Sequence, residues 1–168
     1  MIQAAGEMPR YLSTGEQDSM TIREMSEQEC REALTRLRIG RLGCALDNQP
    51  YIVPVSIVYE EDYIYSFSTP GQKVKWMRAN PKVCVQADEI SGQSKWLSVV
   101  AYGQYQELRE PQFEIERDHA RKLLDRQHHW WLNALAERQL KEGDRLVSPL
   151  FFRIRIESLS GLESKEGG

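Results

Sequence analysis

The chain has 168 residues, of which 40% are hydrophobic and 28% are charged, and its formal net charge is −3. This balance is typical of a folded globular domain, and it gives no general electrostatic reason to bind nucleic acid or an acidic membrane surface. No apolar run approaches the roughly 20 residues that a membrane helix needs, and the N-terminus lacks the pattern of a secretion signal. We therefore expect a cytoplasmic protein without nucleic-acid or membrane partners.

Residues 21–162 are predicted to form one domain, with a flexible N-terminal tail over residues 1–20 and a C-terminal tail over residues 163–168. The chain contains three cysteines, which lie far apart in the sequence and include no Cys-x-x-Cys pair. This pattern predicts buried free thiols rather than a disulfide framework or a metal site. The cysteines are Cys30, Cys44 and Cys84.

The first predicted helix covers residues 27–38. Ser26 and Glu29 form a capping box, and apolar residues follow at helical spacing until Gly40. Turn signals then separate three strands, which we expect to be antiparallel neighbours. These strands cover residues 41–47, 51–60 and 63–68. In the third strand, alternation places three aromatic side chains on one face, namely Tyr63, Tyr65 and Phe67.

A short helix is predicted over residues 73–79, because Asn80-Pro81 follows and a residue before proline disfavours helical conformation. Two strands of a hairpin come next, over residues 83–88 and 95–108. A long helical region begins at Pro111 and reaches about residue 142, with residues 126–129 as a candidate interruption. A last strand is expected over residues 151–156. Antiparallel strands with helices at their ends favour a β-barrel or a strongly coiled sheet.

The joint between the strand ending at Ser68 and the short helix is a candidate phosphate seat. The start of a helix exposes unpaired backbone N–H groups at the positive end of the helix dipole. Two nearby hydroxyls and the ammonium of Lys73 add further donors. The alternative is ordinary turn chemistry, because Ser, Gly and Lys are common at strand-to-helix joints.

Several short segments also follow one another in a recognisable order. They are Gly40-Arg41-Leu42-Gly43, residues 50–56, residues 66–73, Asn80-Pro81-Lys82-Val83 and residues 96–103. In this order they resemble the FMN-binding split-barrel family, which includes proteins related to pyridoxamine 5′-phosphate oxidase and the nitroimidazole reductases. The resemblance covers residues 26–108. It implies a mainly β fold with flanking helices, arranged as an antiparallel split β-barrel of the FMN-binding type. It also implies a homodimer with flavin at the subunit interface.

The resemblance implies a set of flavin-binding residues. Beside the flavin ring it implies Val53, Pro54, Val55 and Ser56; near the ribityl chain and phosphate, Phe67, Ser68 and Thr69; in the phosphate clamp, Gln72 and Lys73; and near the flavin, Ser98. Lys73 matches the family pattern. Gln72 departs from it, because pyridoxamine phosphate oxidases have an Arg-Lys pair here and neutral glutamine loses a bidentate charged donor. Lys75 and Arg78 are candidate replacement cations.

The resemblance also bears on the reaction. The C-terminal segment has no tryptophan, and its two arginines are Arg153 and Arg155, so we do not expect oxidation of vitamin B6. We expect an NAD(P)H-dependent oxidoreductase that reduces a small organic acceptor, with no particular catalytic residue and no metal. The alternative is a non-catalytic flavin- or haem-binding module. The run His128-His129-Trp130-Trp131 is the candidate haem-ligating or interface segment for that alternative.

Overall fold

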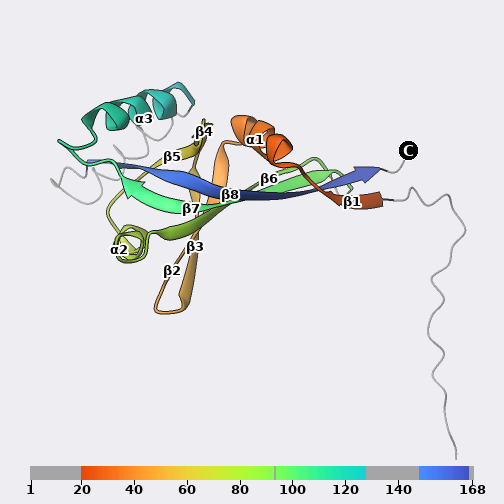
Figure 1. Cartoon of the computed structure of the whole chain (residues 1–168), viewed down its shortest axis with the longest axis horizontal. Helices are drawn as coiled ribbons and strands as arrows, with labels where there is room; N and C mark the ends of the chain where they lie inside the picture. Colours follow the sequence, from red (N-terminus) through yellow and green to blue (C-terminus); the bar gives the residue numbers. More distant parts are fainter. Residues whose placement is uncertain (1–19, 93, 128–147, 167–168) are drawn as a thin grey trace, which may run out of the picture.

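An antiparallel sheet of eight strands dominates the computed structural model, which describes residues 20–92, 94–127 and 148–166 (Figure 1). The sheet order is β3-β2-β6-β7-β8-β5-β4, and β1 pairs with β8. This arrangement confirms the expected mainly β, antiparallel architecture. The strands are β1 (Met20–Glu24), β2 (Ile39–Leu46), β3 (Gln49–Ser56), β4 (Val58–Glu60), β5 (Tyr63–Ser68), β6 (Lys82–Ile90), β7 (Trp96–Glu107) and β8 (Leu150–Glu166).

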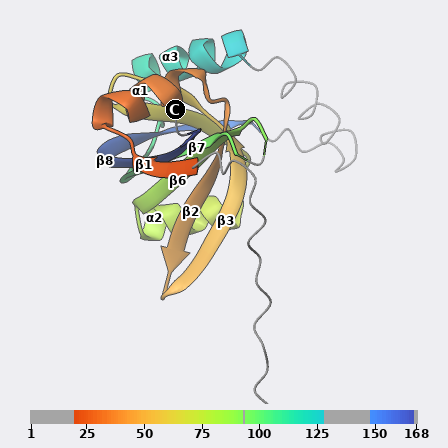
Figure 2. The same ribbon diagram turned by 90° about the vertical axis from the view of Figure 1, so that its right-hand side faces the viewer.

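The helices lie on both sides of the sheet: α1 (Glu27–Arg36) and α3 (Glu114–Gln127) on one side, and α2 (Gln72–Ala79) on the other, together with the β2–β3 hairpin (Figures 1 and 2). The predicted capping box of α1 is present, because the Ser26 side chain accepts from the Glu29 backbone and the Glu29 carboxylate accepts from the Ser26 backbone. Helix α1 buries Cys30, Ala33 and Leu34 against the sheet. None of the described helices is long and apolar enough to cross a membrane.

The two ends of the sheet meet, because β3 at one end continues directly into β4 at the other end through Ile57. Ile57 is fully buried, and its backbone N–H donates to the Arg38 carbonyl. The Ser66 hydroxyl of β5 donates to the Ser56 carbonyl of β3 at 2.7 Å. The sheet thus curls around a central core. Its largest fully buried side chains include Leu34, Leu42, Ile64, Val85, Val99 and Phe152.

Strand β5 separates this core from a smaller cluster under α3. Ile64 belongs to the central core, whereas Tyr65 packs in the second cluster with Ala120 and Leu124 of α3. Tyr63 and Phe67 pack against the same second cluster, so the predicted sharing of one face by the three aromatic residues is confirmed.

Four features differ from the sequence-based expectations. Strand β1 was not predicted, and the predicted strand over residues 51–60 is divided at Ile57. Strand β8 extends to Glu166, so residues 163–166 belong to a strand and not to a tail. The segment after Ile156 is rich in serine and glutamate, and its pairing with β7 and β1 determines its conformation. The fourth difference is the start of α3, which begins at Glu114 and not at Pro111 and is described to Gln127. The expected continuation to residue 142, including residues 128–131, lies outside the described residues.

Candidate functional site

The N-terminus of α2 is open, as the phosphate-seat hypothesis requires. Strand β5 ends at Ser68, and α2 begins after Gly71, whose extended backbone supplies no side-chain cap. The Lys75 N–H donates to the Gly71 carbonyl at 3.1 Å and closes the first turn. The N–H groups at the start of α2 therefore receive no capping side chain from Gly71. Such groups bind anions in many proteins.

The two serines of β5 support the loop from within. The Ser68 hydroxyl donates to the Thr69 carbonyl at 2.7 Å, while the Ser66 hydroxyl donates to the Ser56 carbonyl, as noted above. Both serine side chains are buried. Their protons are directed to backbone carbonyls, so in this conformation these hydroxyls shape the loop and do not present protons to a phosphate.

Among the cations of α2, Lys73 lies in the first turn and Arg78 in the last. Burial raises the pKa of the Cys44 thiol, and the charge of Lys73 opposes that rise, which places Lys73 near the β2 strand. Arg78 makes a bidentate pair with Glu107, with both N–O distances at 2.7 Å. Arg78 therefore pairs with Glu107 at the C-terminal end of α2, away from the N–H groups at its start. Lys75 is exposed, as is Gln72.

Residues 53–56, which are predicted to lie beside the flavin ring, form the second half of β3 at one end of the sheet order. Val55 is buried in the core and Val53 packs against it, so alternation places Pro54 and Ser56 on the opposite face. Two contacts hold α2 against the β2–β3 hairpin. The Tyr51 and Trp76 rings meet edge to face at 5.8 Å, and the Asn80 amide donates to the Ala45 carbonyl at 2.9 Å. Residues 68–69 and 72–73 are thus joined by the β5–α2 loop, and the Ser66–Ser56 hydrogen bond links β5 to the end of residues 53–56.

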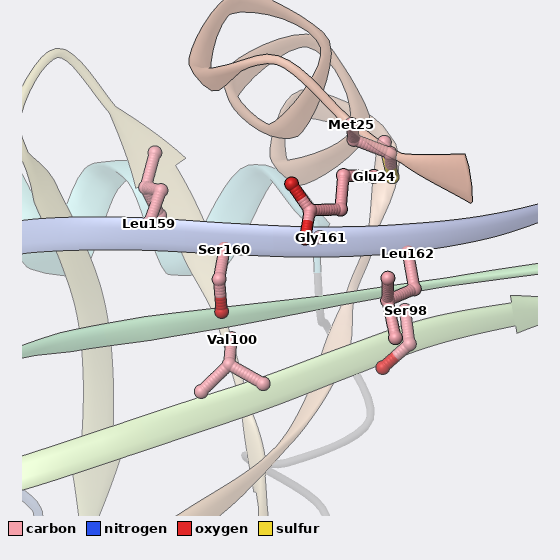
Figure 3. A pocket seen from close by; sticks show the side chains of 8 residues that line it. All are labelled: Glu24, Met25, Ser98, Val100, Leu159, Ser160, Gly161 and Leu162. Carbon is pink, nitrogen blue, oxygen red and sulfur yellow. The ribbon is translucent and has the colours of Figure 1, made fainter.

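Two of the predicted site residues do not join this group. Phe67 points to the cluster beneath α3. Ser98 lines a separate cavity of about 420 Å³ at the far end of β7 (Figure 3). Figure 1 shows α2 and β1 at opposite ends of the sheet, and the cavity lies beside β1. Six of the lining residues are Glu24, Met25, Ser98, Val100, Ser160 and Leu162.

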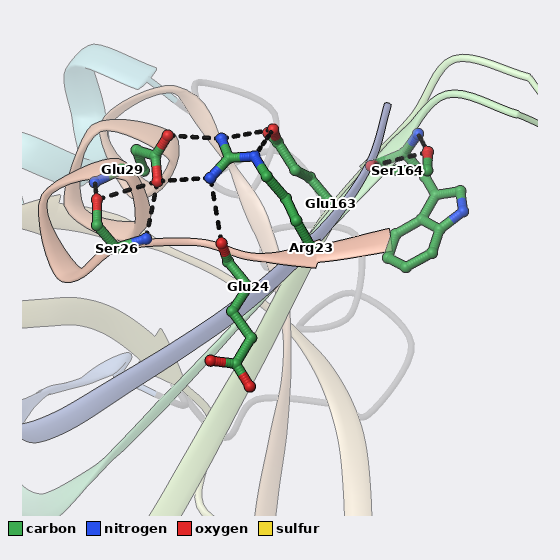
Figure 4. A network of polar contacts seen from close by, with 7 residues as sticks. Arg23, Glu24, Ser26, Glu29, Glu163 and Ser164 are labelled. Atoms are coloured by element: carbon green, nitrogen blue, oxygen red, sulfur yellow. Dashed lines mark hydrogen bonds and ion pairs between the residues drawn. The ribbon is translucent and has the colours of Figure 1, made fainter. Parts of the chain in front are cut away.

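An ion network holds β1 beside this cavity (Figure 4). The Arg23 guanidinium donates to the Glu29 carboxylate at 2.6 Å and to the Glu163 carboxylate at 2.7 Å. Hydrogen bonds from Arg23 and then from the Ser26 backbone lower the pKa of Glu29 to about 2. Nearby, the Ser164 hydroxyl donates to the Ser94 carbonyl and accepts from the Trp96 N–H. These contacts fix β1 and the turn after it, from which Glu24 and Met25 reach the cavity.

Sequence reasoning missed Glu24, Met25 and Gln86 as neighbours of Ser98. The first two belong to β1 and its turn, which pair with a part of β8 that was not predicted as a strand. Gln86 donates to the Ser98 hydroxyl at 2.9 Å. Its outward direction follows from the alternation of residues 83–88, but its contact with Ser98 depends on the β6–β7 register.

The described cysteines are free, with Cys30 and Cys44 buried and Cys84 half-buried. Within residues 20–92, 94–127 and 148–166, no group of three or more His, Cys, Asp and Glu side chains is arranged to hold a metal ion.

Comparisons with known proteins identify relatives over most of the chain. A family model described as pyridoxamine 5′-phosphate oxidase matches residues 26–163. An uncharacterized protein of Rhizobium meliloti is 38% identical over 143 residues, which are 84% of this chain and 95% of the relative. In the crystal structure of a FAD-binding protein from Mesorhizobium loti the identity is 42% and the TM-score 0.71, covering 88% of this chain and 100% of that chain.

A more distant structure has the same fold. A candidate 5-nitroimidazole antibiotic resistance protein from Bacteroides thetaiotaomicron is 15% identical, with a TM-score of 0.63 and 96% of each chain covered. Together with the family match, these similarities confirm the expected split β-barrel.

Proposed function

The chain belongs to the pyridoxamine 5′-phosphate oxidase family, and from this premise we propose that it is a flavin-dependent oxidoreductase that takes electrons from NAD(P)H and reduces a small organic acceptor. The observation that carries the proposal is the uncapped start of α2 after β5, with Lys73 in its first turn. A cytoplasmic location is part of the proposal, because a nicotinamide donor must be available.

In this proposal the start of α2 holds the flavin phosphate. The first-turn N–H groups and Lys73 supply donors, and the loop at Ser68 and Thr69 brings the chain to the phosphate. Residues 53–56 of β3 lie beside the ring. A bound flavin would supply the electron chemistry, accepting a hydride from the nicotinamide and passing electrons to the acceptor. The protein would bind the flavin, orient it and shield it from water.

The identity of the flavin is the finer part of the proposal. The sequence resemblance implies FMN, whereas two observations favour FAD. The relative from Mesorhizobium loti is a FAD-binding protein. In addition, Gln72 leaves one fewer cation at the seat, which suits the single charge of each FAD phosphate better than the about 1.5 to 2 charges of a phosphate monoester. Both flavins share the ring, the ribityl chain and the first phosphate, so the same seat serves either. Chromatography of the heat-released flavin distinguishes them.

We also propose a homodimer with flavin at the subunit interface. Within one chain, Ser98 lies at the opposite end of the sheet from the start of α2 (Figure 1). A partner subunit would bring the Ser98 of one chain toward the α2 seat of the other. A row of residues across four strands, with an exposed apolar side chain at each end, supports this proposal. Tyr102, Cys84, Gly43 and Ile52 are in register across β7, β6, β2 and β3. Tyr102 is 50% exposed and Ile52 is 71% exposed, as expected of apolar side chains that a partner covers.

The test is to add NADH or NADPH to the flavin-loaded protein without oxygen and to record the visible spectrum. Bleaching of the flavin bands, followed by recovery when a quinone or nitroaromatic is added, is expected. Flavin bands that persist with both nicotinamides would contradict the oxidoreductase and favour a binding module. A Soret band would indicate haem instead. The histidine pair at residues 128 and 129 lies outside the described residues and supports neither reading.

A further inference from the structure

Polar side chains form a continuous row on the outer face of β2, β6 and β7, which is the face turned away from the central core. The row leads to Ser98. The Arg41 guanidinium donates to the Asp88 carboxylate at 2.6 Å and to the Gln86 side-chain carbonyl at 3.2 Å. The Gln86 amide nitrogen then donates to the Ser98 hydroxyl oxygen at 2.9 Å. The strand registers hold the row together, because Arg41 lies opposite Gln86 and Asp88 lies opposite Ser98.

The row fixes the direction of each hydrogen bond. A guanidinium group can only donate, so the Gln86 atom facing Arg41 must be the carbonyl oxygen. The amide nitrogen of Gln86 therefore faces Ser98 and donates to it. One lone pair of the Ser98 oxygen is occupied by this bond, which directs the hydroxyl proton toward a different acceptor. Among the described residues, Gln86 is the hydrogen-bond partner of the Ser98 side chain.

One such direction is into the cavity that Ser98 lines. Val100, Leu162 and Met25 supply apolar parts of its lining, and Glu24 and Ser160 supply polar parts. In the view of Figure 3, Ser98 and Val100 lie on one side of β8, while Glu24 and Met25 lie on the other. A ligand in this cavity would thus place an acceptor atom within reach of the Ser98 hydroxyl.

We propose that Arg41 and Gln86 are positioning residues that set Ser98 as a hydrogen-bond donor to an acceptor atom of the flavin ring. This inference rests on the proposed function. The polar edge of a flavin ring carries several acceptor atoms and one N–H donor, so a directed donor complements most of that edge. Because the ring gains negative charge on reduction, a donor at this position stabilises the reduced form and raises the reduction potential.

The test is the reduction potential of the flavin-loaded full-length protein and two variants. Ser98→Ala removes the donor. Gln86→Glu keeps the side-chain shape and the Arg41 contact, but its carboxylate accepts a hydrogen bond from the Ser98 hydroxyl and so reverses the direction of that bond. Each variant is expected to shift the two-electron reduction equilibrium toward the oxidised form by about fivefold to tenfold, the effect of one neutral hydrogen bond. Tenfold corresponds to about 30 mV.

Gln106→Glu is the matched control. Gln106 lies on β7, and like Gln86 it accepts from an arginine, since Arg153 donates to its side-chain carbonyl at 2.6 Å. It does not line the cavity. The same change of amide to carboxylate beside an arginine should therefore leave the potential within about twofold of the wild-type equilibrium.

The double variant separates hydrogen-bond direction from simple charge. If Gln86→Glu acts through Ser98, adding it to Ser98→Ala changes the potential little further, whereas a direct charge effect would add in full. Additive shifts, or a Gln86→Glu variant with the wild-type potential, would overturn the positioning role of Gln86. An unchanged potential in Ser98→Ala would overturn the donor role of Ser98. Failure of the wild-type protein to bind any flavin would instead refute the proposed function, and the positioning inference with it.

Discussion

At the scale of single residues, the candidate site contains Lys73, and Gln72 stands before it where the resemblance to pyridoxamine phosphate oxidases implies an arginine. Lys73 stands in the first turn of α2, Gln72 is exposed beside it, and Arg78 is paired with Glu107. In the proposed site, the charged contribution to phosphate binding would therefore rest mainly on Lys73. Backbone N–H groups at the start of α2 would supply the rest.

Replacing Lys73 by alanine should weaken flavin binding by about 1.5 to 3 kcal/mol, the usual range for a charge-assisted hydrogen bond. Equilibrium titration followed by flavin fluorescence measures the change. Lys75→Ala is the matched control, because it removes the same charge from an exposed position on the same helix, and it should change affinity by less than about 0.5 kcal/mol. Unchanged flavin affinity in Lys73→Ala would remove Lys73 from the phosphate seat, and an equal loss in Lys75→Ala would add Lys75 to it.

Glu107 offers a prediction about stability and pH. Burial alone would raise its pKa, but hydrogen bonds from Arg78 and Arg109 outweigh burial and lower the pKa from 4.5 to about 2. A lowered pKa in the folded state contributes stability above pH 4.5, and this contribution is lost as the pH falls from about 4.5 to 2. Because both arginines are partly exposed, we expect the contribution to be about 1 to 2 kcal/mol.

Glu107→Gln should therefore lower the free energy of unfolding by about 1 to 2 kcal/mol at pH 7, and by clearly less at pH 3. Urea unfolding at the two pH values measures this. Glu89→Gln, at the exposed pair with Arg36, serves as control and should cost less than about 0.5 kcal/mol at either pH. A Glu107→Gln effect that grows toward pH 3 would have the wrong sign.

These residues mark the limit of sequence-based reasoning about the site. The start of α2 and Lys73 could be predicted, because they depend on a local strand-loop-helix pattern. The pairing of Arg78 with Glu107 could not, since the two residues are 29 positions apart and meet only after β7 is placed. The same applies to Gln86 and Ser98, whose contact depends on strand register.

At the scale of elements, the β7–β8 pair is the longest ladder of the sheet, and it contains one irregularity. The register shifts between Tyr102 and Gly103. A side chain at Gly103 would put its Cβ atom only 2.1 Å from the Arg155 carbonyl oxygen. Glycine is thus required by the close approach of the neighbouring backbone, which cannot move as a flexible side chain would.

Gly103→Ala should lower the free energy of unfolding by at least about 2 kcal/mol, because the ladder must separate to admit the methyl group. Denaturant unfolding measures this loss. Gly71→Ala provides the control, since its Cβ atom would have nothing nearer than the Thr69 carbonyl oxygen at 4.0 Å. It should stay within about 0.5 kcal/mol, as reduced freedom of the unfolded chain offsets a weaker cap. Equal losses in both variants would refute the close-approach explanation.

The elements that could be predicted have local sequence signals, whereas those that could not be predicted take their conformation from pairing with other strands. Helix α1 and strand β5 carry their own signals, a capping box and an aromatic alternation. The second half of β8 does not, because Glu157, Ser158 and Ser160 have no strong β preference. Strand β1 is only five residues long and has no turn signal of its own. Their strand conformation comes from pairing with β7 and with each other, and from the Arg23 network.

At the scale of the whole molecule, the outer face of the sheet is the proposed dimer interface. Ile52→Lys places a charge at the exposed end of the row formed with Tyr102, Cys84 and Gly43, and it should weaken the dimer without unfolding the subunit. Sedimentation equilibrium of the purified protein measures the dissociation constant, which we expect to rise at least about tenfold. Ile115→Lys is the control, because Ile115 is 82% exposed on α3, away from this row.

A monomeric wild-type protein, or an Ile52→Lys variant that dimerises as tightly as the Ile115→Lys control, would contradict the proposed interface. A weaker dimer should also bind flavin less tightly, because the proposal divides each flavin site between two subunits. Loss of the dimer with unchanged flavin affinity would place the whole site within one chain.

The central claim is that this chain is a flavin-binding member of its family, with the flavin phosphate at the start of α2. The most direct measurement is a fluorescence titration of flavin-free wild-type protein with FMN and, separately, with FAD. Saturable binding of one flavin per subunit, with a dissociation constant of about 1 μM or less for at least one of them, is the predicted result. The absence of saturable binding of either flavin would contradict the account.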